Sequence, residues 1–109
     1  MSNASQRAMI EAERSLAATS FDSTLQAIGT PLANSPAIMV FDNQTDVSVP
    51  LYIDGVLFKT FVEGDVFVLD LRANNGTAVN FGFDKGSLFQ TDAAVGTSGS
   101  FRISTIYAG

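Results

Sequence analysis

The sequence contains no cysteine, no histidine and no tryptophan. Without cysteine, the chain forms no disulfide and offers no thiolate to a metal ion or to a substrate. Without histidine, it lacks the usual general base, the usual zinc ligand and the usual pH switch near neutrality. The lack of tryptophan weakens two further interpretations, sugar stacking and anchoring at a membrane interface. Most classes of hydrolase and metalloprotein are therefore disfavoured.

Basic residues are scarce as well. Lys and Arg number 6 against 11 Asp and Glu, so the formal net charge is -5. The cations are scattered along the chain, whereas a nucleic-acid-binding protein needs a clustered basic surface. No segment approaches the length of a membrane-spanning helix, and Glu11, Glu13 and Arg14 interrupt any apolar core of a signal peptide. We therefore expect no nucleic-acid partner and no membrane partner, with cytoplasmic synthesis as the default.

What remains is the composition of one folded domain. The chain has 109 residues, of which 46% are hydrophobic and 16% are charged. A disordered chain is less apolar and more charged than this. The length suits a single domain with one modest core.

Residues 1–20 differ in composition from the rest. Segment 5–18 is rich in helix-forming residues, and Ser5 is a suitable N-cap. A thin apolar stripe follows one side of this helix, formed by Met9, Ala12, Leu16 and Ala17. Because so short a helix is marginal on its own, we expect residues 1–20 to be a helical arm that docks on its own domain or on a neighbour. Residues 21–109 then form the folded domain.

From Phe21 onward, apolar residues alternate with polar ones, and turn residues recur every few positions. This pattern is typical of short antiparallel strands. Strands are expected at 21–28, 37–41, 47–53, 56–61, 66–72, 79–83, 87–91 and 101–107. Segments 37–41 and 66–72 are apolar on both faces, which favours central strands. The sequence thus predicts an all-β fold, an antiparallel β-sandwich with a short N-terminal helical arm. Jelly-roll connectivity is compatible with it, but strand order is left open.

The pair Asp54-Gly55 lies between two alternating segments and predicts a two-residue type I′ hairpin. The resulting register pairs Ile53 with Val56, Leu51 with Phe58, and Val49 with Thr60. Pro50 cannot donate to a strand ladder, so an edge strand or a bulge is expected there. The predicted core comprises Leu51, Ile53, Phe58, Phe81, Phe83 and Ile103.

Candidate chemistry is confined to turns and loops. The carboxylate pairs Glu63/Asp65 and Asp42/Asp46 could in principle support glycoside hydrolysis, and segment 42–46 offers oxygen ligands to calcium. Each pair is equally explained by a turn in which Asx side chains bond their own backbone.

Two further motifs are weaker. Ser98-Gly99-Ser100 resembles half of a nucleophile elbow but lacks the full motif and the helix that should follow it. Segment 96–99 lacks the Gly-Lys-Ser/Thr ending of a phosphate loop. The phenylalanines at 81, 83 and 101 could stack nucleobases, although their alternation favours a core. We assign no catalytic, cofactor-binding or metal-binding residue.

Five phrases follow one another in the sequence: Asp42-Asn43-Gln44-Thr45-Asp46-Val47-Ser48-Val49, Asp54-Gly55-Val56, Val68-Leu69-Asp70-Leu71-Arg72-Ala73-Asn74, Gly96-Thr97-Ser98-Gly99-Ser100-Phe101 and Tyr107-Ala108-Gly109. Together they resemble small structural proteins of tailed bacteriophages, over about residues 24–109. The phrases consist of turns and strands, so the resemblance transfers no functional residue.

The resemblance implies a non-enzymatic virion protein, present in many copies at the neck, the head-to-tail connection or the tail. Its partners would be copies of itself in a symmetric homo-oligomer and other virion proteins, after synthesis in the host cytoplasm. A small domain without recognisable chemistry suits such symmetric assembly. The alternatives are a capsid decoration (cement) protein, a small carbohydrate-binding β-sandwich module and, least favoured, a small hydrolase.

Overall fold

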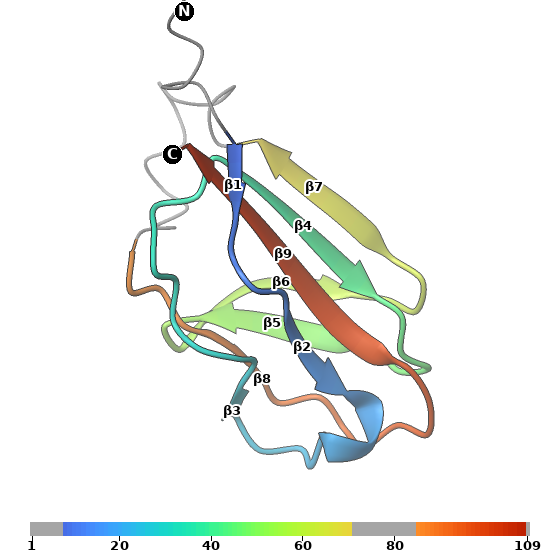
Figure 1. The fold of residues 1–109 in the computed structure, drawn as a ribbon. Coiled ribbons are helices and arrows are strands. Elements are labelled where there is room, and N and C mark those ends of the chain that lie inside the picture. Colours follow the sequence, from blue (N-terminus) through green and yellow to red (C-terminus); the bar gives the residue numbers. More distant parts are fainter. Residues whose placement is uncertain (1–7, 71–84, 109) are drawn as a thin grey trace, which may run out of the picture.

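The computed structural model describes residues 8–70 and 85–108 (Figure 1). Within these ranges the chain forms β-strands and one turn of 3-10 helix, η2 (Ala18–Ser20). In chain order the strands are β1 (Ala8–Ile10), β2 (Arg14–Ala17), β3 (Gln26–Ala27), β4 (Ile38–Asn43), β5 (Val49–Ile53), β6 (Val56–Phe61), β7 (Val66–Asp70), β8 (Phe89–Thr91) and β9 (Ser100–Ala108). The expected strand 79–83 and the expected core residues Phe81 and Phe83 lie outside the described residues.

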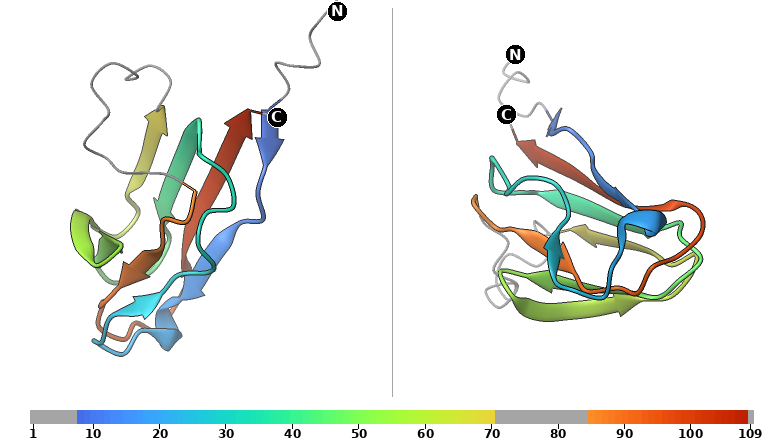
Figure 2. Two further views of the ribbon diagram at one scale, coloured as in Figure 1. Left: turned by 90° about the vertical axis from the view of Figure 1, so that its left-hand side faces the viewer. Right: turned by 90° about the horizontal axis from the view of Figure 1, so that it is seen from below.

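The strands form two antiparallel sheets. The first sheet has the order β1-β9-β4-β7, with β2 also paired to β9, and the second has the order β3-β8-β5-β6. The pairs are nested along the chain: β2 pairs with β9, β3 with β8, β4 with β7, and β5 with β6. The chain therefore folds back on itself as one long hairpin that is divided between two layers, as Figure 2 shows. The all-β, antiparallel two-sheet prediction is confirmed.

Aromatic side chains join the two sheets. Phe41 on β4 is fully buried, and its ring centroid lies 5.7 Å from that of Phe61 on β6 and 6.1 Å from that of Phe89 on β8. Phe101 on β9 also contacts Phe61, with 5.3 Å between the ring centroids. Edge-to-face and tilted aromatic pairs of this kind add to the free energy gained from burial alone. The core therefore lies between the layers.

The expected N-terminal helix is wrong for the residues that the structure describes. Residues 8–10 and 14–17 are strands β1 and β2, which pair with β9 along the edge of the first sheet. Helix propensity differs among most residues by only tenths of a kcal/mol, and a lone short helix would bury little. Pairing with β9 instead satisfies the backbone, packs Leu16 against the core and buries Ala18 completely.

The predicted hairpin is confirmed at its turn and corrected further along. Asp54 and Gly55 both have positive φ, 52° and 84°, as a type I′ turn requires. Ile53 lies opposite Val56 as expected, but the register shifts between Leu51 and Tyr52. The predicted pairs Leu51–Phe58 and Val49–Thr60 are therefore wrong, and the observed pairs are Leu51–Lys59 and Val49–Phe61.

The shift is a β-bulge on β6, where Phe58 is the extra residue between Lys59, opposite Leu51, and Leu57, opposite Tyr52. Pro50 itself lies opposite Thr60 in regular register, and β5 is an inner strand, so the edge or bulge expected at Pro50 is not found at that residue. Because one extra residue reverses the faces of everything beyond it, Phe61 turns into the core and is fully buried. Of the other predicted core residues, Leu51, Ile53 and Ile103 are buried, and Phe58 packs partly buried against the core.

The two apolar segments expected to be buried on both faces are not. On β4 only alternate residues are buried, among them Met39 and Phe41. Within the described residues β7 pairs with β4 alone, and Val66 and Val68 are 58% and 59% exposed. The second face of these strands is therefore an apolar surface on the outside of the first sheet.

Candidate functional site

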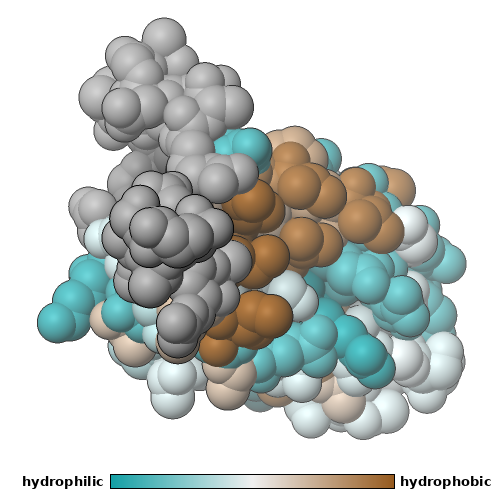
Figure 3. Space-filling view, turned by 45° about the horizontal axis from the view of Figure 1, so that its top comes forward, coloured by the Kyte–Doolittle hydropathy of each residue, from teal (hydrophilic) through white to brown (hydrophobic). Residues whose placement is uncertain are grey.

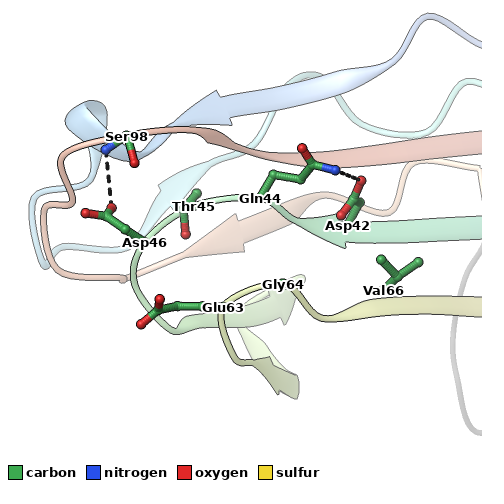
Figure 4. A pocket seen from close by; sticks show the side chains of 8 residues that line it. All are labelled: Asp42, Gln44, Thr45, Asp46, Glu63, Gly64, Val66 and Ser98. Atoms are coloured by element: carbon green, nitrogen blue, oxygen red, sulfur yellow. Dashed lines mark hydrogen bonds between the residues drawn. The ribbon is translucent and has the colours of Figure 1, made fainter.

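Three connections meet at one end of the sandwich: β4–β5, β6–β7 and β8–β9. Hydrogen bonds join them, from Gly64 N to the Asn43 carbonyl (2.9 Å) and from Gln44 N to the Ser100 carbonyl (3.1 Å). Here we call these connections the loop end. They enclose an open depression of about 520 Å³, lined by Asp42, Gln44, Thr45, Asp46, Glu63, Gly64, Val66 and Ser98 (Figure 4). The predicted pair Asp42/Asp46 thus faces one depression together with Glu63.

Asn43 organises this end from inside. The side chain is fully buried, and its Nδ2 donates to the carbonyls of Val47, Phe61 and Val62 at 2.9–3.0 Å. Its Oδ1 accepts from the backbone N–H and the hydroxyl of Thr45. The predicted turn over 42–46, in which side chains bond nearby backbone, is therefore confirmed. Asn43 also holds the β6–β7 connection, and no pattern in the nearby sequence predicts this contact.

Asp46 holds the β8–β9 connection in place, because both of its carboxylate oxygens accept hydrogen bonds from that connection. It accepts hydrogen bonds from the backbone N–H of Thr97 (2.9 Å) and of Ser98 (3.3 Å), and also from the Thr97 hydroxyl. The Thr97 hydroxyl, helped by these two N–H groups, lowers the pKa of Asp46 to about 2. Its lone pairs are therefore already engaged by the protein.

Two glycines allow the connections to approach so closely. A Cβ on Gly96 would lie 2.6 Å from Oδ1 of Asp46. A Cβ on Gly99 would lie 1.8 Å from the carbonyl oxygen of Gln44, and Gly99 also has a φ of +81°. Segment 96–99, weighed above as a phosphate loop, thus packs its backbone against residues 44–46. The candidate nucleophile elbow at Ser98 precedes strand β9 instead of a helix.

The remaining carboxylates of the two predicted pairs have different surroundings. Glu63 lines the depression, but its predicted companion Asp65 lies 3.7 Å from Lys59 Nζ in an ion pair. Asp42 Oδ2 accepts from the Gln44 amide at 2.8 Å, while its buried Oδ1 has no hydrogen-bond partner. Over residues 8–70 and 85–108, no group of three or more carboxylates is placed to hold a metal ion. The eight residues that line the depression include no aromatic side chain.

A second candidate surface covers the outside of the first sheet. Strand register places six aliphatic residues on it, here called the outer apolar face: Ile10, Ile38, Val40, Val66, Val68 and Ile106. In the space-filling view, hydrophobic residues gather in a band on this side of the molecule (Figure 3). Ile10 is 75% exposed. A contiguous apolar patch of this kind marks a contact surface more often than a single exposed aliphatic residue does.

Charged residues share this face with the aliphatic ones. Asp70 on β7 lies opposite Ile38, and Glu13 accepts a hydrogen bond from the Ser104 hydroxyl. Arg102 on β9 lies directly opposite Asp42 on β4, in the same register that places Ile106 opposite Ile38. Because side chains two residues apart along a strand point to the same side, the charged row and the isoleucine row share the outer surface. The sequence showed the apolar character of 37–41 and 66–72 but assigned it to burial within one chain.

Among the described residues, no helix is long and apolar enough to cross a membrane. No family model, no curated protein and no solved structure matches this chain.

Proposed function

We propose that this chain is a non-enzymatic structural subunit of the virion of a tailed bacteriophage, assembled in many copies at the neck, the head-to-tail connection or the tail. The observation that carries the assembly role is the outer apolar face. A monomeric domain of this size gains nothing from exposing Val66, Val68 and Ile10 on one sheet. A subunit that buries them against a neighbour gains their transfer from water.

The strand order supports the proposal at the level of fold. With β1 and β2 taken as one interrupted strand, the nested pairing of β2–β9, β3–β8, β4–β7 and β5–β6 is that of a jelly roll. Jelly rolls are common among viral capsid domains and lectins. A fold alone does not determine function. The proposed place in a virion therefore rests on the resemblance of the turn-and-strand phrases to structural proteins of tailed bacteriophages.

The loop end argues for structure over chemistry. Its carboxylates hold neighbouring connections, as Asp46 holds Thr97, or bond nearby side chains, as Asp42 bonds Gln44. Its depression also lacks the aromatic platform on which a carbohydrate module stacks a sugar ring. A capsid decoration protein would use the same outer apolar face on a different part of the particle.

The test is the protein content of purified particles. Particles from the organism that encodes this chain are banded in a density gradient and quantified by mass spectrometry, with the major head and tail proteins as internal standards. We expect the chain to band with the particles at a fixed ratio of several copies per particle. Immunogold labelling then distinguishes the neck and tail from the capsid surface. A chain found only in the soluble lysate would overturn the proposal.

A further inference from the structure

We propose that two copies of this chain join edge to edge, by antiparallel pairing of strand β7 with β7 of the second copy. The inference rests on the proposed function, because it names the contact through which copies of the subunit assemble. It also assigns the residue that lies on the two-fold axis, Val68, and the backbone groups that pair across it.

The sandwich has four sheet edges among its described strands, and three of them carry a feature that hinders strand pairing. Strand β3 is only Gln26–Ala27. Strand β6 contains the bulge at Phe58, followed by Lys59. The β1–β2 edge is interrupted at residues 11–13, which stand opposite only residues 104–105 of β9. Short strands, bulges and edge lysines are common means by which proteins keep an edge from pairing with another chain.

The fourth edge, β7, has none of these features. Val66–Asp70 pairs with β4 in unbroken register and contains no glycine, proline or lysine. Val66 and Val68 are 58% and 59% exposed. In the described part of the chain no strand pairs with the other side of β7, which forms the border of the first sheet in Figure 1. A regular, apolar and open edge is a template for a further strand.

The backbone groups that β7 turns toward this open edge follow from its ladder with β4. Asn43 N donates to the Asp65 carbonyl at 2.9 Å, so residue 65 faces β4. In an antiparallel ladder every second residue turns its N–H and C=O to the same neighbour. Phe67 therefore also faces β4, whereas Val66 and Val68 direct their N–H and C=O groups to the open edge.

An antiparallel pairing centred on Val68 uses these groups. Val68 of one copy exchanges N–H and C=O bonds with Val68 of the second copy, and Val66 lies opposite Asp70 on each side of the axis. Both copies present the same residues to each other, as a two-fold interface requires. The two Val68 side chains contact across the axis, and an apolar cross-strand pair of this kind stabilises a sheet.

Charge selects both the register and the partner. The chain carries a formal net charge of -5, and Asp70 is the charged residue of β7. With Val68 on the axis, the two Asp70 residues are separated by about 13 Å along the strands, beyond the screening length of about 8 Å at physiological salt. A register centred on Asp70 would instead set carboxylate against carboxylate. A second copy thus brings an equally regular, apolar strand with its carboxylate away from the axis, and a subunit present in many copies meets that strand at high local concentration.

A charge exchange at the axis tests the pairing. Sedimentation equilibrium of the full natural chain over a wide concentration range should show a monomer–dimer equilibrium. Val68→Asp and Val68→Lys each set like charges directly opposite each other and should weaken the dimer about tenfold or more. An equal mixture of the two variants should dimerise again, because position 68 of one copy then meets the opposite charge at position 68 of the other. A mixture as weak as the separate variants, or a natural chain that stays monomeric, would overturn the proposal.

Proline tests the backbone bonds. Val68→Pro removes an N–H that points to the open edge and leaves the ladder with β4 intact, so it should abolish the dimer in a folded chain. Thr60→Pro is the matched control on β6. Asp54 N donates to the Leu88 carbonyl, so Pro50 likewise faces β8, and Thr60 opposite Pro50 faces the open edge of β6. Thermal unfolding shows whether each variant is folded, and the charge exchange decides the question if Val68→Pro is not. A folded Val68→Pro chain that dimerises as well as Thr60→Pro would overturn the pairing.

The outcomes separate this inference from the proposed function. A natural chain that remains monomeric, although particles contain it, would overturn the β7 pairing and leave the virion role standing. A dimer that recovers in the mixture of charge variants, in a chain missing from particles, would support the pairing and overturn the virion role.

Discussion

Glu11 and Arg14 form an ion pair with 2.8 Å between Oε1 and Nη2, and both side chains are almost fully buried at the edge of the first sheet. Arg14 Nε and Nη2 also donate to the carbonyls of Thr30 and Pro31, at 2.7 and 2.9 Å. Glu11 Oε2 in turn accepts from the backbone N–H of Asn34 at 2.9 Å. The pair therefore ties the N-terminal strands to the connection between β3 and β4.

Breaking this pair should destabilise the fold strongly. Arg14→Ala leaves the Glu11 carboxylate buried beside the space that the guanidinium had filled, and the loss of one member of a buried pair costs about 3–5 kcal/mol. We expect the double variant E11Q/R14M to lose less than Arg14→Ala alone, since it leaves no buried charge without a partner. Urea unfolding followed by circular dichroism measures both losses. Glu13→Gln, two residues from Glu11, is the control and should change the free energy of unfolding little.

The loop end should lose stability at acidic pH, over a pH range that depends on the pKa of Asp46. Its folded pKa is lowered from 3.8 to about 2, mainly by the Thr97 hydroxyl and then by backbone N–H groups. A lowered carboxyl pKa contributes stability that is full above the unfolded value and is lost as pH falls through the folded value. The contribution of Asp46 should therefore disappear between about pH 4 and pH 2.

The measurement is the melting temperature as a function of pH for the natural sequence and for Asp46→Asn. The variant should melt lower near pH 6, and the two curves should converge toward pH 2. Glu63→Gln changes a carboxylate on the same depression that makes none of these bonds to residues 97–98, and its curve should stay parallel to that of the natural sequence. Parallel curves for Asp46→Asn would contradict the assignment.

How far the sequence predicts this fold depends on how local each contact is. The turn at Asp54-Gly55 is encoded by two adjacent residues that accept positive φ, and it was predicted correctly. The bulge at Phe58 arises from the pairing of two strands, and no local residue marks it: Pro50, where a departure was expected, pairs regularly with Thr60. The N-terminal helix failed because weak local propensity was overridden by pairing with β9, which lies near the other end of the chain.

The same distinction applies to the candidate sites. The turn over 42–46 is local, and its Asx bonding was predicted. The bond from Thr97 to Asp46 spans 51 residues, and no local pattern marks it. To predict the outer apolar face from the sequence, one would need to know that β7 pairs with β4 and that Val66 and Val68 point outward. Apolar character alone does not distinguish burial within a chain from burial between chains.

Two glycines with similar φ should respond differently to alanine. Gly55 and Gly99 have φ of 84° and 81°, so alanine at either position incurs the strain of a left-handed conformation, about 1 kcal/mol or somewhat more. At Gly55 no atom lies within 4 Å of the added Cβ, whereas at Gly99 the Gln44 carbonyl oxygen lies 1.8 Å from it. Gly99→Ala must therefore also displace the backbone of the β4–β5 connection.

We expect Gly99→Ala to lower the free energy of unfolding by clearly more than Gly55→Ala does. Chemical denaturation of the two variants beside the natural sequence gives both values. Equal losses would mean that the β8–β9 connection moves away without cost, and that the loop end is less tightly packed than the contacts indicate.

Removal of the N-terminal segment gives the sharpest contrast between the sequence-based expectation and the structure. A docked helical arm predicts that deletion of residues 1–20 leaves a stable domain. The structure predicts the opposite, because β1 and β2 cover the edge of β9, Arg14 holds the β3–β4 connection, and Ala18 is fully buried. The deletion also exposes the edge of β9, and an uncovered edge strand invites pairing with other chains. We therefore expect the truncated protein to aggregate or to unfold at a much lower temperature.

Deletion of residues 1–7 alone is the control, since it leaves both strands in place. A truncated domain that remains monomeric and melts like the full chain would show that β1 and β2 contribute little to the fold, and would restore the interpretation of residues 1–20 as an arm available to a neighbouring subunit.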